Sequence, residues 1–161
     1  MNLLKPNIYN KDIYSINYQK IKDNNIKCLL FDLDNTIATL DDNQPSKETI
    51  KLFNELKRMD FSVYIFSNAL PKRVEPFRRT LKVIGVPFAL KPLKRNFKRM
   101  LKTFKKEEIA IIGDQIFTDV FGGNKVGITT ILVDPISKKD LIITKIFRFL
   151  EKLVKRGDYH E

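Results

Sequence analysis

The stretch CLLFDLDNT, residues 28–36, places two acidic residues, Asp32 and Asp34, directly after the apolar run Cys28–Phe31. Such a run is typical of a buried strand, and a buried strand rarely ends in two carboxylates that have no function. Because residues i and i+2 share a face of an extended chain, both carboxylates can point to one place. Carboxylates this close repel each other unless a cation or a shared proton relieves them. We therefore expect a metal and acid–base site here, although a polar loop beginning after a strand would give the same short pattern.

Three further apolar runs each end in side chains that can bind a metal or an anion. They are Val63–Phe66 before Ser67 and Asn68, Pro87–Leu90 before Lys91, and Ile109–Ile112 before Gly113 and Asp114, with Asp119 five residues after Asp114. Parallel sheets bind their ligands at the carboxyl ends of the strands, so these side chains should meet at one edge. Taken singly, Ser67 or Lys91 would be an ordinary polar residue at a strand end.

The combined set suits phosphoryl transfer from a phosphate monoester, whose hydrolysis needs up to ~10²¹-fold acceleration. Asp32 can attack as a carboxylate and form an aspartyl-phosphate. Asp34 can protonate the leaving group and then activate water. Mg²⁺ prefers oxygen ligands, and Asp114 with Asp119 can complete its shell. Side chains at the other two strand ends are left to hold the phosphate.

These motifs and their order resemble those of the haloacid dehalogenase (HAD) superfamily. Motif I is matched by Asp32–Thr36, motif II by Ser67, motif III by Lys91, and motif IV by Gly113–Gln115 with Asp119. The resemblance implies a nucleophile at Asp32 and an acid/base at Asp34, and an acid at position 34 favours the phosphatase branch. It implies Mg²⁺ held by Asp32, the backbone carbonyl of Asp34 and Asp114, with Asp119 assisting. The phosphate would be bound by Thr36, Ser67, Asn68 and Lys91, with Lys94 or Lys98 as alternatives to Lys91.

Strand and helix patterns alternate along the chain and predict an α/β fold with a Rossmann-like HAD core. Helices are expected from Ser46 as N-cap to about Met59, over 72–84 with Gly85 ending it, over 93–104, and near 118–125. With strands at 28–31, 62–67, 87–90, 109–112 and 129–133, the sheet would have about five parallel strands and helices on both faces. We expect one domain over residues 1–161, in which 1–26 form a lead-in segment.

The intervals between motifs leave no room for a cap domain. A loop and one helix account for 37–62, and a helix and a strand account for 69–90. An uncapped site is open, so we expect either an oligomer partner that closes it or a substrate that is large or surface-bound.

Basic residues are concentrated in two places in this chain of net charge +11. Residues 91–106 hold eight basic residues and no acidic one, and residues 138–156 hold seven, with Asp140 and Glu151 as the only acids. The second segment has apolar residues at helical spacing, which predicts a basic amphipathic helix. Such a helix can lie on an anionic membrane. It can equally pack its apolar stripe on the sheet, which is the commoner role of such stripes.

Composition favours a soluble cytoplasmic protein, with 43% hydrophobic and 30% charged residues in 161. No apolar stretch is long enough to span a membrane, and the amino terminus does not have the pattern of a secretory signal. The single cysteine, Cys28, suits a core position and not a redox site. The basic segments suggest a peripheral location at the inner face of the membrane.

A closer resemblance, to the YqeG-type phosphatases of HAD subfamily IIIA, extends over nearly the whole chain. It rests on Leu4–Pro6, Tyr14–Ile16, Asn25–Lys27, Gly113–Val120, Asn124, Gly127 and Thr130–Val133. Related mitochondrial enzymes convert phosphatidylglycerophosphate to phosphatidylglycerol, so the resemblance implies a lipid-headgroup substrate. A soluble phosphatase for a nucleotide, sugar phosphate or phosphoprotein is the alternative. An RNA- or ribosome-binding module is less favoured, because no aromatic-rich RNA-binding signature is present, and a nucleic-acid partner is not expected.

Overall fold

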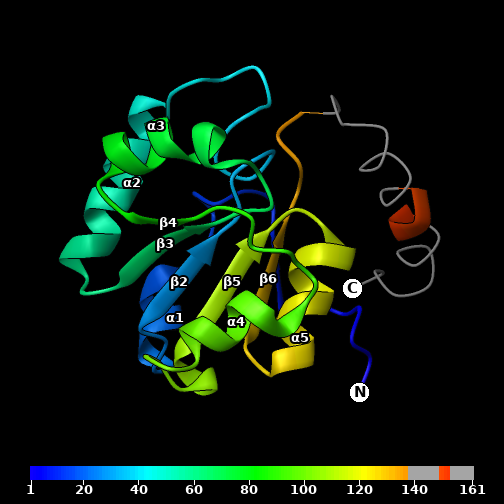
Figure 1. The fold of residues 1–161 in the computed structure, drawn as a ribbon. Coiled ribbons are helices and arrows are strands. Elements are labelled where there is room, and N and C mark those ends of the chain that lie inside the picture. Colours follow the sequence, from blue (N-terminus) through cyan, green and yellow to red (C-terminus); the bar gives the residue numbers. More distant parts are fainter. Residues whose placement is uncertain (138–148, 153–161) are drawn as a thin grey trace.

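A six-stranded, fully parallel sheet runs through the molecule in the order β1-β6-β5-β2-β3-β4 (Figure 1). The computed structural model describes residues 1–137 and 149–152. The strands are β1 (Ile8–Asn10), β2 (Cys28–Phe31), β3 (Ser62–Phe66), β4 (Ile84–Val86), β5 (Ile109–Gly113) and β6 (Thr129–Val133). The predicted α/β fold is confirmed, with one strand more than expected. The extra strand is β1, which the sequence hides because it is a short, partly exposed edge strand.

Helices cover both faces of this sheet. They are α1 (Tyr18–Asp23), α2 (Lys47–Arg58), α3 (Pro71–Leu81), α4 (Lys94–Met100) and α5 (Phe121–Val126), with a 3₁₀ turn, η1 (Lys106–Glu108), and a π-helical turn, η2 (Ile116–Val120). Alternate residues of β2 face opposite sides, as the pleat requires. Leu29 and Phe31 join the core cluster beneath α1, α2 and α3, whereas Cys28 and Leu30 join the cluster beneath α4 and α5. All four are buried, which explains why this strand reads as a continuous apolar run.

The helix α2 forms as its sequence predicts. The Ser46 hydroxyl accepts a hydrogen bond from the Thr49 backbone N–H at 3.1 Å and so caps the first turn. Leu52, Phe53 and Leu56 are buried along one face. The ring centroid of Phe53 lies 4.8 Å from that of Phe31 on β2. This contact fixes the helix over the strand that leads to Asp32.

Two predicted boundaries around α3 are wrong. The helix ends at Leu81 and not at residue 84, because Lys82 turns left-handed at φ 53° and its N–H bonds back to the Arg78 carbonyl. Gly85 lies inside β4 rather than ending the helix, and it allows the strand to pass close to Val74 of α3. The expected strand over 87–90 is instead a loop, because Phe88 and Leu90 adopt positive φ and cannot continue a ladder.

The connections between the central strands hold no inserted domain. Residues 32–61, all described, contain α2 and loops, and residues 67–83 contain α3 and short turns. The expected absence of a cap is therefore confirmed for these connections.

The basic helix predicted over 138–156 lies mostly outside the described residues. Residues 149–152 are helical, and the Glu151 carboxylate accepts a hydrogen bond from the Ile116 backbone N–H at 2.6 Å. Glu151 is buried there, whereas Phe149 and Leu150 are exposed. Among the described residues, no helix has the length and apolar character needed to cross a bilayer.

Candidate active site

The predicted site residues converge at the carboxyl edge of the sheet because their strands are neighbours. Strand β2 pairs with β3 on one side and with β5 on the other. Their ends therefore bring Asp32, Ser67 and Asp114 to one place, and all three side chains are buried. The loop after β4 adds Lys91.

Three carboxylates form the centre of the site. One oxygen from each of Asp32, Asp114 and Asp119 lies within 4.8 Å of the others. The Thr36 hydroxyl joins two of them, since its Oγ1 lies 3.1 Å from Asp114 Oδ1 and 3.4 Å from Asp32 Oδ2. A cluster of buried carboxylate oxygens is the donor set that hard divalent cations prefer, so these residues could hold such an ion.

Lys91 balances the charge of this cluster. Its Nζ lies 2.9 Å from Asp32 Oδ1 and 2.6 Å from Asp119 Oδ1, and the residue is 5% exposed. Burial alone would lower the pKa of Lys91, but the Asp119 and Asp32 carboxylates more than offset this and hold it above its usual value. Burial raises the pKa of Asp119. Lys94 and Lys98, the alternative lysines, are both exposed on α4.

The backbone of Lys91 is held by Asn68. The Asn68 side-chain carbonyl accepts a hydrogen bond from the Lys91 N–H at 2.8 Å, and its amide donates to the Lys91 carbonyl at 3.0 Å. Asn68 therefore uses both ends of its amide to position the lysine. Its neighbour Ser67 is buried, and its hydroxyl accepts a hydrogen bond from the Ala69 N–H at 3.0 Å.

Asp34 is held apart from the three-carboxylate cluster by an arginine that the sequence analysis missed. Asp34 Oδ1 accepts hydrogen bonds from Arg73 Nε at 3.1 Å and Nη2 at 2.9 Å. Arg73 also donates to the backbone carbonyls of Thr39 and Asp42, so it ties the loop after β2 to α3. Burial raises the pKa of Asp34, and the guanidinium of Arg73 works against that rise.

No spacing rule singles out Arg73 among the basic residues of α3. The available signal is its place in the first turn of a helix that begins just after a strand end carrying a site residue, Ser67. From there a long side chain can reach across the carboxyl edge to the end of β2.

Asp119 lies on the π-helical turn η2, which follows the end of β5. Its carboxylate packs directly over Gly113, where an added Cβ would come within 2.1 Å of Asp119 Oδ2. The Gln115 N–H donates to Asp119 Oδ2 at 3.2 Å. Gly113 is therefore required for the close approach of this carboxylate, and π-helical turns are frequent at functional sites. The helix predicted near 118–125 thus forms as two segments, η2 and α5.

The family model for mitochondrial PGP phosphatase matches residues 1–137. The probable phosphatase YqeG of Bacillus subtilis is 38% identical over 154 residues, which cover 92% of this chain and 88% of the relative. Phosphatidylglycerophosphate phosphatase 1, chloroplastic/mitochondrial, of Arabidopsis thaliana is 24% identical over 165 residues, which cover 94% of this chain but 47% of the plant protein.

Solved structures show the same fold at low sequence identity. The cobalt-bound deoxy-D-mannose-octulosonate 8-phosphate phosphatase of Haemophilus influenzae superposes with a TM-score of 0.57 at 17% identity, over 77% of this chain and 75% of that one. A HAD family enzyme of Bacteroides thetaiotaomicron, in complex with magnesium and inorganic phosphate, gives a TM-score of 0.54 at 14% identity, over 74% of this chain and 98% of that one. Taken with the family match, these findings show that the chain belongs to the mitochondrial PGP phosphatase family and is a phosphatase of the HAD type.

Proposed function

We propose that the protein hydrolyses a phosphate monoester on a lipid headgroup, phosphatidylglycerophosphate, through a phosphorylated Asp32. The observation that carries the mechanism is the convergence of Lys91 and three buried carboxylates, of which Asp32 is one. Lys91 Nζ holds Asp32 Oδ1, which fixes the orientation of the carboxylate for attack. A positioned nucleophile gains much of its rate from this kind of pre-organisation.

The chemistry takes place in two steps. Asp32 attacks phosphorus, the bond to the leaving oxygen breaks, and Asp34 donates a proton to that oxygen. Asp34 then takes a proton from water, which attacks the aspartyl-phosphate, releases inorganic phosphate and restores Asp32. Lys91, Ser67 and Thr36 are assigned to the phosphoryl group as donors. Asn68 positions Lys91 through its amide and has one further N–H with which to donate to the phosphoryl group.

The donor set fits Mg²⁺. The carboxylates of Asp32 and Asp114 and the backbone carbonyl of Asp34 would hold it, and Asp119 would assist from its contact with Lys91. When bound, Mg²⁺ supplies charge neutralisation for the phosphoryl oxygens.

The lipid substrate is supported by the family and by the name of the plant relative. Connections 32–61 and 67–83 without an inserted domain also suit a headgroup that stays attached to a large or surface-bound molecule. We further propose that residues 1–161 act as one domain at the cytoplasmic face of a membrane.

A substrate panel tests this proposal. Phosphate release is measured with Mg²⁺ for phosphatidylglycerophosphate in vesicles, for the free headgroup analogue glycerol 3-phosphate, and for nucleotide, sugar and protein phosphates. We expect the highest kcat/KM for the lipid. Equal or faster turnover of a water-soluble ester would contradict the lipid assignment and favour a soluble phosphatase.

Arg73 is expected to act as a positioning residue for Asp34. Arg73→Gln removes the two hydrogen bonds to Asp34 Oδ1 but leaves Asp34 itself in place. We therefore expect kcat for an alkyl phosphate to fall roughly 10- to 100-fold, less than most of the ~10²–10⁴-fold that general acid–base catalysis contributes. The Arg73→Lys variant cannot restore both bonds and should recover only part of the rate.

The leaving group separates positioning from a purely structural effect. The nitrophenolate leaving group of p-nitrophenyl phosphate needs little protonation, so its hydrolysis should be much less sensitive to Arg73→Gln. An equal loss for both esters would contradict the assignment. Arg79→Gln, a change at an exposed arginine of the same helix, serves as the matched control.

A further inference from the structure

Four large apolar side chains are exposed around the candidate active site. Leu70, Phe88, Leu90 and Leu93 are 48%, 49%, 42% and 57% exposed, and we call them the apolar rim. They lie in the two loops that also carry Ser67 and Lys91, at the carboxyl ends of β3 and β4. The rim therefore borders the same carboxyl edge of the sheet as the site.

Hydrogen bonds hold the two rim loops together. The Phe88 N–H donates to the Ala69 carbonyl at 3.1 Å, which places Phe88 beside the residue that precedes Leu70. The Leu93 N–H donates to the Leu90 carbonyl at 2.7 Å and closes a turn. These bonds tie Phe88 to the loop that carries Leu70, and Leu93 to Leu90, so the backbone brings the four rim residues to one part of the edge.

Two bulky residues of the rim have backbone torsion angles that such residues rarely adopt. Phe88 and Leu90 adopt positive φ values of 47° and 56°, a region that bulky residues avoid and that glycine or asparagine would occupy more easily. Between and after them, Ala89 and Lys91 are buried. The same backbone path that directs Lys91 inward therefore turns Phe88 and Leu90 outward. Phe88 and Leu90 are only partly covered by the protein although their backbone is strained, which points to a role outside the core.

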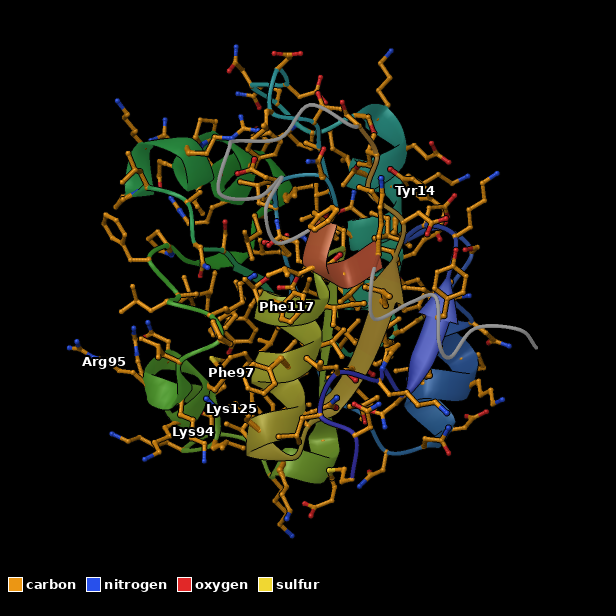
Figure 2. All side chains as sticks on the ribbon, turned by 90° about the vertical axis from the view of Figure 1, so that its right-hand side faces the viewer. Tyr14, Lys94, Arg95, Phe97, Phe117 and Lys125 are labelled. Atoms are coloured by element: carbon orange, nitrogen blue, oxygen red, sulfur yellow. The ribbon has the colours of Figure 1, made fainter. Side chains whose placement is uncertain are left out.

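Positive charge flanks the apolar rim on the side of α4. No acidic residue occurs between Glu75 and Glu107. The helix α4 begins directly after Leu93 and exposes Lys94, Arg95, Lys98 and Arg99. Figure 2 shows Lys94 and Arg95 extending away from the body of the protein, whereas Phe97 is turned inward. Phe97 packs at a centroid distance of 4.9 Å from Phe66, so α4 is fixed on the sheet with its basic face outward.

We propose that the apolar rim is a docking surface for an anionic lipid bilayer. The rim side chains would enter the region below the headgroups, and the basic residues of α4 would contact the anionic headgroups. This docking would turn the carboxyl edge of the sheet toward the membrane and present a headgroup phosphate to Lys91 and Asp32. The inference rests on the proposed lipid-phosphate activity and adds the surface by which the substrate is reached.

Charge complementarity favours a bilayer over the other occupants of an apolar surface. A second copy of this chain would bring one basic α4 near another, and like charges oppose that pairing. RNA would match the charge but could stack a base only on Phe88, because the three leucines of the rim offer no base-stacking surface.

The test is co-sedimentation of the full chain with vesicles of phosphatidylcholine alone and of an equal mixture of phosphatidylcholine and phosphatidylglycerol. The apolar variant is the double substitution Phe88→Asn and Leu93→Ser. Asparagine tolerates positive φ, and serine suits the N-cap position of α4, so both changes fit the existing backbone. The charge variant is Arg95→Gln with Arg99→Gln, two exposed arginines of α4.

Matched controls change an exposed apolar residue and two exposed basic residues that belong neither to the rim nor to α4. Ile84→Asn changes an apolar residue on β4 that is 59% exposed, and Lys20→Gln with Lys22→Gln removes two exposed lysines of α1. We expect wild type and controls to bind only the anionic vesicles. Each rim or charge variant should bind them about tenfold or more weakly. Turnover of soluble p-nitrophenyl phosphate should be unchanged in all of them.

Three outcomes would overturn the inference. They are anionic-vesicle binding by the rim variants equal to wild type, a change in oligomeric state in those variants without a change in vesicle binding, and RNA that competes for the surface more strongly than lipid. Because vesicle binding is measured without turnover, its loss in the variants would support the docking surface even if no lipid phosphate were hydrolysed. Conversely, lipid turnover without any rim dependence would support the proposed function alone.

Discussion

Asp32→Asn is expected to abolish phosphate release while leaving the fold intact. The amide has the shape of the carboxylate but cannot attack phosphorus, and removal of a catalytic nucleophile costs about 10⁴-fold or more in kcat. The measurement is Mg²⁺-dependent release of inorganic phosphate under steady-state conditions. A second measurement is covalent labelling of the protein by substrate, which should disappear in the variant.

Asp60→Asn is the matched control for this variant. Asp60 is exposed in the turn before β3, at the amino end of the strand, and its φ of 66° suits asparagine equally well. We expect wild-type turnover from it. Phosphate release by Asp32→Asn at a rate close to wild type would contradict the role of Asp32 as nucleophile.

Lys91→Met is expected to produce the largest loss of stability among the site variants. It removes the ammonium that lies within 3 Å of both Asp32 and Asp119 and leaves these buried carboxylates with their mutual repulsion. Breaking a buried ion pair by removing one partner costs about 3–5 kcal/mol in the free energy of unfolding. Urea denaturation at pH 7.5 in the presence of a chelator measures the loss. The change Lys94→Met, at an exposed residue on α4, should stay within about 0.5 kcal/mol of wild type.

The loss caused by Lys91→Met should depend on pH. Burial raises the pKa of Asp119 to about 7, whereas an unfolded aspartate titrates near 3.9. A folded state that keeps its proton while the unfolded state releases it loses stability as pH rises between these two values. Without the ammonium, the buried carboxylates hold protons more strongly, so this loss becomes larger. The stability gap between variant and wild type should therefore be smaller at pH 5 than at pH 7.5, and an equal gap at both would contradict the charge-balancing role.

Asp32, Asp34 and Asp114 could be placed at the edge of the sheet from the sequence because they follow apolar strands. Asp32 and Asp34 stand out as two acids after a buried run, and Asp114 follows another such run. Parallel pairing of β2 with β5 then brings the two ends together without any further information. A pattern of burial along the chain was enough to predict this part of the site.

The contact of Arg73 and the position of β4 could not be predicted, because they depend on tertiary packing that leaves no local pattern in the sequence. Arg73 reaches Asp34 across the carboxyl edge, and an arginine in a basic helix looks the same whether it bonds a carboxylate or water. The fourth strand of the sheet was predicted at 87–90 but lies at Ile84–Val86 for a related reason. The apolar stretch around residues 83–90 supports either strand position, and the left-handed turns at Lys82 and Phe88 decide between them through packing. The short edge strand β1 lacked any periodic signal.

The parallel order of the sheet also determines when the site can exist during synthesis. Cys28 pairs with Ile109, so the strand that ends in Asp32 must wait for a partner about eighty residues later in the chain. Contacts between distant residues form slowly because a long loop must close before they contribute. A growing chain that has not yet reached β5 carries the nucleophile without Asp114 or Asp119. Catalytic competence therefore arises only after the chain has been made as far as η2 and β5 has paired with β2 in the middle of the sheet.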